Sequence, residues 1–260
     1  MKSLFFVNLP EAKLLFHVKH DLVQLAKSGE MVSRETSHYL KTNLLLAGGR
    51  VPEVKWLQSL ASEDKMSVYC ADKGVDYALA AGLSPSLVVG DCDSSSPAFY
   101  EQAQALGAKL ELHPPAKDDT DLQLLLAKLP AGNLVATGIW GGRFDHLFSN
   151  VYSLLSFKEQ QHCQVILADE QELMLLLTSE DVVEVELKHL EQVHALSLLP
   201  LGENSCVSLK GVRWPLEQAF LSQQRPYSIS NEAKEKKISC SCHSGKVGLY
   251  IHWQKRSTAK

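Results

Sequence analysis

Long apolar runs are absent from this sequence, and their absence limits what the protein can be. None of the runs approaches the roughly 18 residues that a membrane-spanning helix needs, so we expect no insertion into a membrane. The first residues, MKSLFFVNLPEAK, contain only a brief apolar patch and no small-residue cleavage site, which predicts a chain that is not secreted. No internal repeat or low-complexity segment interrupts the 260 residues.

Positive charge and cysteine are also scarce. The 26 Lys and Arg residues are outnumbered by 30 Asp and Glu residues, and the net charge of -4 argues against a nucleic-acid binder and favours a small-molecule partner. Six scattered cysteines fit reduced thiols in the cytoplasm better than a disulfide framework. Cys240 and Cys242 stand beside His243 like half a zinc site, but alternation along a strand would point both thiols to one face. We predict that these two cysteines pack in the core or on a sheet face.

The composition that remains supports a sizeable core. Hydrophobic residues make up 45% of the chain, enough for one large domain or two of typical size. Near the N-terminus, apolar residues recur at helical spacing: Leu14, Leu15, Val18, Leu22 and Leu25. They predict an amphipathic helix over residues 11–27, within an N-terminal helical extension of residues 1–42.

Residues 43–170 have the pattern of a parallel-sheet, Rossmann-like α/β domain. Short apolar runs that end in Gly or Asp read NLLLAGG, MSVYCAD, SLVVGD and NLVATG. They alternate with helical stretches such as VDYALAAG, AFYEQAQALG and DLQLLLAKL. Apolar strands that alternate with helices indicate parallel βαβ units whose strands are buried on both faces.

Residues 171–260 have a different pattern, which predicts a C-terminal β-sandwich domain. Their short, often alternating segments read DVVEVEL, HALSLLPL, CVSLKGV, KISCSC and VGLYIHW, with little helical periodicity between them. The expected fold class is therefore α/β followed by all-β, with the boundary near residues 160–180.

Polar clusters follow the predicted strands of the first domain. They are ADKG with Asp72, GDCDS with Asp91 and Asp93, KDDTD with Lys117, Asp118, Asp119 and Asp121, and GGRFDH with Arg143, Asp145 and His146. The carboxyl ends of parallel strands share one edge of a sheet, so we expect these clusters to converge there. Carboxylates are natural Mg²⁺ ligands, and a cation would offset the repulsion between neighbouring acids.

The basic residues of these clusters suit phosphate. Lys117 offers a point charge and Arg143 a bidentate fork. No nucleophilic Cys or Ser arrangement accompanies them, and the P-loop motif is absent from the sequence. This combination indicates a phosphate-transfer site that works by positioning and charge.

Several of the same residues also have structural interpretations. Thr120 and Gln123 form a capping-box pattern before a helix, and Asp119 is expected to be solvated. His146 is expected to pack at the start of the helix that continues through LFSNVYSLLSF. In the second domain, Trp214 beside Pro215 can simply cover one end of the sandwich. Ser228, Ser230 and Asn231 are ordinary turn residues by type.

Taken in order, six motifs resemble those of thiamine pyrophosphokinase (thiamine diphosphokinase): ADKG, GDCDS, KDDTD, GGRFDH with FSN, LKGVRWPLE and SISNE. The resemblance runs from about Leu44 to Trp253. It implies transfer of pyrophosphate from ATP to thiamine, giving thiamine diphosphate and AMP, with Mg²⁺ required. It also implies a homodimer whose active sites are shared between the α/β domain of one subunit and the β domain of the other.

The resemblance also implies roles for individual residues. The Mg²⁺ and phosphate-site acids would be Asp91, Asp93 and Asp121, with Asp72 nearby. Lys117 and Asp118 would face the nucleotide phosphates. Arg143 with Asp145 would organise the transferring group. The thiamine-contacting groups would be Ser228, Ser230, Asn231 and Trp214, the last suited to cover the cationic thiazolium. Lys73 departs from the family pattern, which usually has Gly or Ser there.

Three other functions remain open from the residues themselves. An Asp-x-Asp after an apolar strand is also found in haloacid-dehalogenase-like phosphohydrolases, where the first Asp is a nucleophile, and in metal-dependent nucleotide-sugar transferases. A nucleotide- or thiamine-binding module without catalysis would carry the same binding residues. Incubation with ATP, Mg²⁺ and thiamine separates these alternatives.

Overall fold

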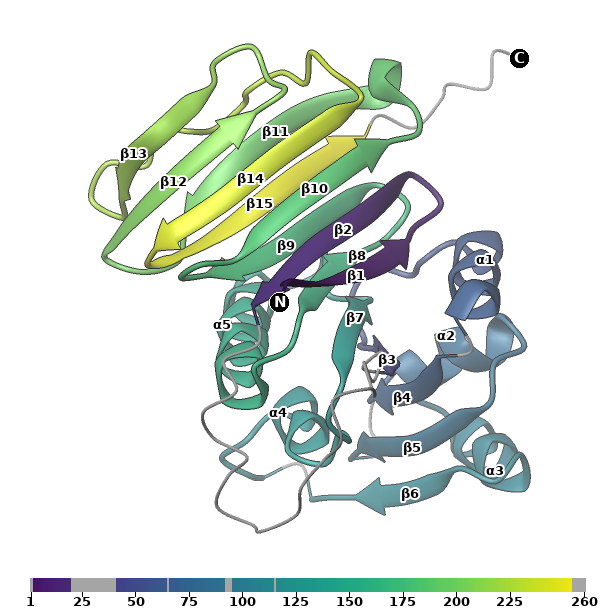
Figure 1. Cartoon of the computed structure of the whole chain (residues 1–260). Helices are drawn as coiled ribbons and strands as arrows, with labels where there is room; N and C mark the ends of the chain where they lie inside the picture. The colour runs from purple at the N-terminus through teal and green to yellow at the C-terminus, as the bar shows by residue number, and fades with distance from the viewer. Residues whose placement is uncertain (1, 20–40, 65, 92–94, 115, 254–260) are drawn as a thin grey trace, which may run out of the picture. The chain divides into compact units, whose positions relative to one another are not determined.

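A computed structural model describes residues 2–19, 41–64, 66–91, 95–114 and 116–253 (Figure 1). The fold is mixed α/β, with parallel and antiparallel sheets. Two compact units share the chain: unit 1 is Met1–Leu40 with Leu177–Leu249, and unit 2 is Lys41–Leu176 with Tyr250–Lys260. Among the described helices, none is both long and apolar enough to cross a membrane.

Unit 2 is built on a mainly parallel sheet. Its strand order is β9-β8-β7-β3-β4-β5-β6, in which β9 is antiparallel to β8. The strands are β3 (Thr42–Leu46), β4 (Ser67–Ala71), β5 (Pro85–Gly90), β6 (Lys109–Leu112), β7 (Asn133–Thr137), β8 (Val165–Ala168) and β9 (Glu172–Thr178). Every residue of β3, β7 and β8 is buried, as expected for strands covered on both faces.

Five helices flank this sheet on two sides (Figure 1). They are α1 (Val54–Asp64), α2 (Gly74–Ala80), α3 (Pro97–Ala105), α4 (Asp121–Leu126) and α5 (Phe144–Gln161). The chain runs outward from β3 to β6 through α1, α2 and α3, and then returns to β7 and β8 through α4 and α5. The strand order therefore reverses between β3 and β7. The carboxyl ends of strands at such a point are where open α/β sheets bind ligands.

The four strands predicted for this part of the chain are present as β3, β4, β5 and β7, and the predicted helical stretches as α2, α3 and α4. Sequence analysis did not identify α1, β6 or β8. In β6 the four residues KLEL are exposed or half-buried, so the continuous apolar run that marks the other strands is missing there.

Unit 1 is an antiparallel assembly. Its larger sheet has the order β1-β2-β10-β14-β12-β13, and β11 lies beside β15. The strands are β1 (Lys2–Asn8), β2 (Ala12–Lys19), β10 (Val182–Leu187), β11 (Val193–Pro200), β12 (Asn204–Lys210), β13 (Leu216–Ser222), β14 (Lys237–Ser244) and β15 (Lys246–Trp253), with a 3-10 turn at Leu190–Gln192. Cys240 and Cys242 both lie in the core on one face of β14, which confirms the packing prediction.

The helix predicted over residues 11–27 is wrong where the structure describes this segment. Residues 12–19 form β2, which pairs with β10 and places Leu14 and Phe16 in the core. Within the predicted N-terminal extension, the described residues 2–19 form β1 and β2 and are not helical. The apolar residues of this stretch satisfy both a helical and an alternating pattern, and the distant β10 supplies the partner that selects the strand. The rest of the predicted helix, residues 20–40, lies outside the described residues.

One glycine joins α2 closely to the end of β3. A Cβ atom added at Gly74 would lie 2.0 Å from the carbonyl oxygen of Leu46. The first turn of α2 therefore rests directly on the backbone at the carboxyl end of β3. This contact positions the β4–α2 turn, which carries Asp72.

We predict that Gly74→Ala destabilises the protein by about 1–3 kcal/mol, because the backbone must shift to admit the methyl group. Urea unfolding followed by circular dichroism measures the change. Gly202→Ala is the control, since the nearest atom to its added Cβ is 3.7 Å away, an ordinary contact. Equal stability of the two variants would contradict the close packing of α2 on β3.

Candidate active site

Three acidic side chains converge at the carboxyl edge of the unit 2 sheet. Asp72 follows β4, Asp91 follows the neighbouring β5, and Asp121 is the first residue of α4. One carboxylate oxygen from each lies within 4.8 Å of the others. The predicted convergence is thus confirmed for these three residues, while Asp93 lies outside the described residues.

Lys117 supplies a positive charge to this cluster. Its Nζ atom is 2.8 Å from each carboxylate oxygen of Asp121 and 3.8 Å from Oδ2 of Asp91. Burial alone would lower the pKa of Lys117, but its hydrogen bond with Asp121 and the nearby carboxylates outweigh burial and raise that pKa. The ammonium group therefore stays charged and offsets part of the repulsion among the acids.

The carboxyl group of Asp72 has a raised pKa. Burial raises its pKa to about 7, helped by the charge and hydrogen bonding of Asp121 and the charge of Asp91, whereas Lys117 acts in the opposite direction. Its buried Oδ1 atom has no hydrogen-bond donor among the described residues. A Cβ atom added at Gly90 would lie 3.2 Å from that oxygen, so glycine keeps this space open.

These features fit a divalent cation with a preference for oxygen ligands. Three carboxylates face one another, one of their oxygens is buried without a donor, and a single lysine cannot neutralise them all. Mg²⁺ takes such ligands and retains waters that leave room for phosphate oxygens.

A capping box places Asp121 in the cluster. The Thr120 hydroxyl accepts a hydrogen bond from the backbone N–H of Gln123, and the Gln123 side chain accepts one from the backbone N–H of Thr120. The capping prediction is confirmed, and it explains why α4 begins with the buried Asp121. Asp118 and Asp119 are exposed beside it, and no described contact joins either to the three acids.

Arg143 and Asp145 lie at the start of α5 and pair with each other. The guanidinium donates to both carboxylate oxygens of Asp145, at 3.1 and 2.5 Å. These hydrogen bonds raise the pKa of Arg143 and lower that of Asp145. Both side chains are exposed, and no described contact joins them to the acid cluster. They follow β7, and β3 lies between β7 and β4, the strand that Asp72 follows. His146 is also exposed, so its predicted packing is wrong.

Sequence analysis missed an ion-pair network at the point where the strand order reverses. Arg50 follows β3 and donates through Nε and Nη2 to Oδ2 of Asp169, at 2.9 and 2.6 Å, and through Nη2 to Glu172 at 2.9 Å. The other oxygen of Asp169 accepts two backbone N–H groups. Tyr250 donates to Glu172 at 2.9 Å. The glycine pair before Arg50 in NLLLAGGR, directly after a predicted strand, was the sequence feature that could have indicated a functional loop here.

The loops after β3 and β7 are also joined by their backbones. Gly49 donates to Gly138 at 2.7 Å, and Arg50 donates to Trp140 at 2.5 Å. These bonds continue the β3–β7 pairing beyond the strands. The network and the paired loops hold the carboxyl edge of the sheet in a defined shape.

The residues predicted to contact thiamine lie in unit 1. Trp214 is 53% exposed, whereas Asn231 is buried and binds the backbone of Trp214 through its side chain. Ser228 is buried, and Ser230 is exposed with a positive φ of 58°. The structure thus brings Trp214 and Asn231 together.

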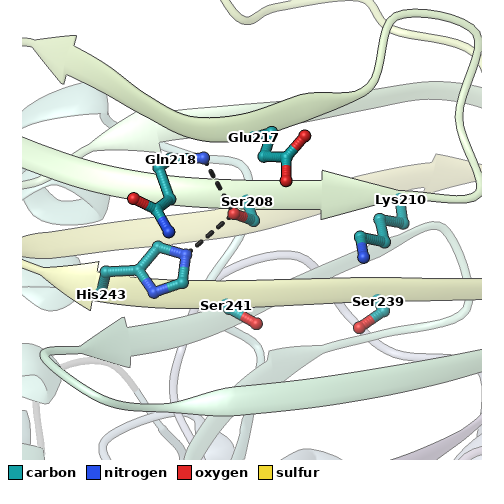
Figure 2. A pocket seen from close by; sticks show the side chains of 7 residues that line it. All are labelled: Ser208, Lys210, Glu217, Gln218, Ser239, Ser241 and His243. Carbon is teal, nitrogen blue, oxygen red and sulfur yellow. Dashed lines mark hydrogen bonds between the residues drawn. The ribbon is translucent and has the colours of Figure 1, made fainter.

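A separate hollow of about 180 Å³ lies on the exposed side of β12, β13 and β14 (Figure 2). Ser208 accepts a hydrogen bond from the backbone of Gln218 at 3.0 Å and is 2.8 Å from Nε2 of His243. Lys210 and Glu217 of the LKGVRWPLE motif line this hollow, but none of the predicted site residues does.

Family models match a segment of each unit. Residues 57–167 match the family model described as the thiamin pyrophosphokinase catalytic domain, and residues 183–247 match its vitamin B1 binding domain. Together the two matches cover about two thirds of the chain. The chain belongs to the thiamine pyrophosphokinase family. The first match contains the acid cluster and Lys117, and the second contains Trp214 and Asn231.

Members of the thiamine pyrophosphokinase family from Oryza sativa and Bacillus subtilis resemble the chain. Thiamine pyrophosphokinase 1 of Oryza sativa is 29% identical over 171 residues, which cover 62% of this chain and 63% of that relative. The match therefore spans less than two thirds of the rice protein. Thiamine pyrophosphokinase of Bacillus subtilis is 27% identical over 198 residues, or 74% of this chain and 90% of the relative. The crystal structure of a B. subtilis thiamine pyrophosphokinase is similar with a TM-score of 0.68 at 25% identity, covering 83% of this chain and 100% of that one.

We predict that, without divalent cations, Asp72→Asn raises the melting temperature more at pH 8 than at pH 5. The pKa of Asp72 in the folded protein, about 7, exceeds its ordinary value of 3.8. Its contribution to stability is therefore fully present below pH 3.8 and is lost as the pH rises through 7. At pH 8 the substitution removes a charge that the other acids repel.

Differential scanning calorimetry in EDTA at both pH values measures this effect. Asp119→Asn serves as the control, because Asp119 is exposed. An equal shift for Asp72→Asn at pH 5 and pH 8 would show that Asp72 is already ionised at pH 5.

Proposed function

We propose that the protein is a Mg²⁺-dependent thiamine diphosphokinase that transfers pyrophosphate from ATP to thiamine, giving thiamine diphosphate and AMP. The observation that carries this proposal is the convergence of Asp72, Asp91 and Asp121 with Lys117 at the carboxyl edge of the sheet. These residues lie within the part of the chain that matches the family's catalytic domain. Relatives named thiamine pyrophosphokinase support the same reaction.

The acids would hold Mg²⁺ at the phosphates, with Asp91, Asp93 and Asp121 as ligands and Asp72 beside them. Bound Mg²⁺ supplies charge neutralisation to the phosphate oxygens. Lys117 already lies in the cluster and is positioned to meet phosphate oxygens as well as Asp121. Its charge persists at neutral pH because the carboxylates raise its pKa.

In the proposed reaction, the hydroxyl oxygen of thiamine forms a bond to the β-phosphorus of ATP and loses its proton. The bond from that phosphorus to the oxygen bridging the α- and β-phosphates breaks, and AMP leaves with the electron pair. No protein nucleophile is required, so the chain contributes positioning and charge. Asp118 would face the nucleotide phosphates.

Arg143 would bind the transferring phosphates, with Asp145 orienting it. Its present partner is Asp145, in an exposed pair that costs little to exchange for phosphate. The start of α5 and the glycines before it leave the guanidinium accessible. This role explains why the Arg143 guanidinium lies in the loop between β7 and α5 without a buried partner.

We further propose that unit 2 is a Rossmann-like nucleotide-binding domain and that residues 171–260 contribute a β-sandwich thiamine-binding domain. Trp214, Ser228 and Ser230 would contact thiamine, with Asn231 in the same segment. The match of residues 183–247 to the vitamin B1 binding domain supports this assignment. The five described cysteines are free thiols, which supports a cytoplasmic location.

A homodimer would complete each active site, because the acids and the thiamine segment belong to different units. Helix α5 has an exposed aromatic row suited to a second copy of the chain. Phe144 and Phe148 are exposed, with ring centroids 6.0 Å apart, and Tyr152 follows at 4.9 Å from Phe148. A hollow of about 440 Å³ beside Phe148 and Tyr152 adds to this surface. Covering such a row would remove apolar area from water.

We predict that Asp121→Asn lowers turnover roughly a thousandfold while the protein stays folded, because the proposed Mg²⁺ site loses the charge of one ligand. The assay incubates the protein with ATP, Mg²⁺ and thiamine and quantifies AMP and thiamine diphosphate. Asp119→Asn is the matched control, and we expect it to retain wild-type turnover.

The products distinguish the alternatives. Inorganic phosphate without thiamine diphosphate would favour the haloacid-dehalogenase-like phosphohydrolase, with Asp91 as the nucleophile. Thiamine binding without turnover in the wild-type protein would favour a non-catalytic module. Full activity of folded Asp121→Asn would remove the acid cluster from the mechanism.

We predict that Phe148→Glu raises the dissociation constant of the homodimer at least about tenfold, because it places a charge in the aromatic row. Sedimentation velocity over a concentration series measures the change. Gln161→Glu adds the same charge at the far end of α5 and is expected to leave the dimer intact.

Mixed dimers test whether the sites are shared. One subunit carries Asp121→Asn and the other carries Trp214→Ala with Ser230→Ala. If each site uses both subunits, every heterodimer regains one competent site. A monomeric active protein, or inactive heterodimers of proven composition, would contradict the shared-site proposal.

A further inference from the structure

The side chain of Asn231 has nearly exhausted its hydrogen-bonding capacity within unit 1. Oδ1 accepts from the backbone N–H of Trp214 at 3.2 Å and from that of Glu232 at 2.8 Å. Nδ2 donates to the carbonyl oxygen of Trp214 at 2.9 Å. An amide has two acceptor positions and two N–H donors, so only one donor remains. With 5% of the residue exposed, Asn231 has little surface to offer a ligand.

The backbone of Asn231 is anchored as firmly as its side chain. Its N–H donates to Leu196 of β11 at 2.7 Å, and Leu196 donates back at 2.9 Å. The preceding residue, Ser230, donates its N–H to the hydroxyl of Ser197 at 3.0 Å. Asn231 therefore connects β11 to the turn that carries Trp214. Its carboxamide bonds both the N–H and the C=O of Trp214, as a residue of a neighbouring strand would.

The Trp214 side chain is held by a second contact. The guanidinium of Arg213 lies over its ring, 4.7 Å from the centroid. Glu232 binds Arg213 at 2.8 Å and Lys234 at 2.9 Å, so the guanidinium is itself kept in place. The guanidinium covers one face of the ring, and 53% of the Trp214 residue is exposed, which leaves accessible surface for a flat ligand.

We propose that Asn231 is a positioning residue that acts on the ligand through Trp214, and that Arg213 fixes the tilt of the indole. The clamp holds the indole ready before binding, which lowers the ordering cost of stacking a flat, cationic ring on it. The identity of that ring as thiamine rests on the proposed function, whereas the clamp does not. This role replaces the direct thiamine contact expected for Asn231.

The clamp can be tested without any ligand. Trp214 is the exposed member of the four tryptophans, because Trp56, Trp140 and Trp253 are at most 4% exposed. Acrylamide quenching and fluorescence anisotropy therefore report on Trp214, with Trp214→Phe defining the signal of the other three. We expect Asn231→Ala to increase quenching and lower anisotropy, and Asn204→Ala, at an exposed Asn of the same unit, to change neither.

The route of action is tested by a double-mutant cycle on thiamine kinetics. We expect Asn231→Ala to raise the thiamine KM about tenfold, with the ATP KM and kcat unchanged, and to have no further effect in a Trp214→Ala background. If the double variant raised the thiamine KM by the product of the two single effects, Asn231 would contact the ligand independently of Trp214. That result would overturn the proposal.

Arg213→Gln keeps the test decisive if Asn231→Ala does not fold, because Arg213 is exposed. It should increase the mobility of Trp214 and raise the thiamine KM only when Trp214 is present. Unchanged anisotropy and KM in this variant would overturn the support by Arg213. If the wild-type protein does not use thiamine, the proposed function fails, and the ligand-free fluorescence still decides whether the clamp exists.

Discussion

The mutual repulsion of Asp72, Asp91 and Asp121 is the constraint on which the rest of the candidate active site depends. Three carboxylates within 4.8 Å of one another are costly unless positive charge or protons compensate them. Lys117 compensates in part, and the pKa of Asp72 is raised first by burial and then by the neighbouring Asp121 and Asp91. The three acids outnumber the one lysine that contacts them, and such a cluster of carboxylate oxygens favours a divalent cation.

The rest of unit 2 keeps this strained arrangement in place. The buried strands β3, β7 and β8 form a stiff centre, and the capping box of α4 places Asp121 at the start of a helix. At the point where the strand order reverses, Arg50 and Asp169 join the loops after β3 and β8 through two hydrogen bonds. These two hydrogen bonds limit how far the two loops can move apart.

In unit 1, a neutral side chain holds a candidate site residue in place. The Asn231 carboxamide holds the backbone of Trp214, and Arg213 covers one side of the ring. A neutral amide suits this task because it satisfies both the backbone N–H and the backbone C=O of Trp214 without adding a charge beside the indole. The acidic edge and the indole thus represent two ways of preparing a site, one electrostatic and one geometric.

Local pattern was enough to predict part of this protein. Apolar runs identified β3, β4, β5 and β7, the Thr120–Gln123 pattern identified the start of α4, and the motifs indicated the family that the comparisons confirm. These features depend on neighbours within a few residues or on motif order, both of which the sequence displays directly. Only the tertiary structure decided that residues 12–19 form a strand, that Asp169 lies opposite Arg50 across 119 residues, and that Asn231 binds Trp214. Each of these outcomes depends on which distant segment supplies the hydrogen-bond partner, and a one-dimensional pattern does not contain that choice.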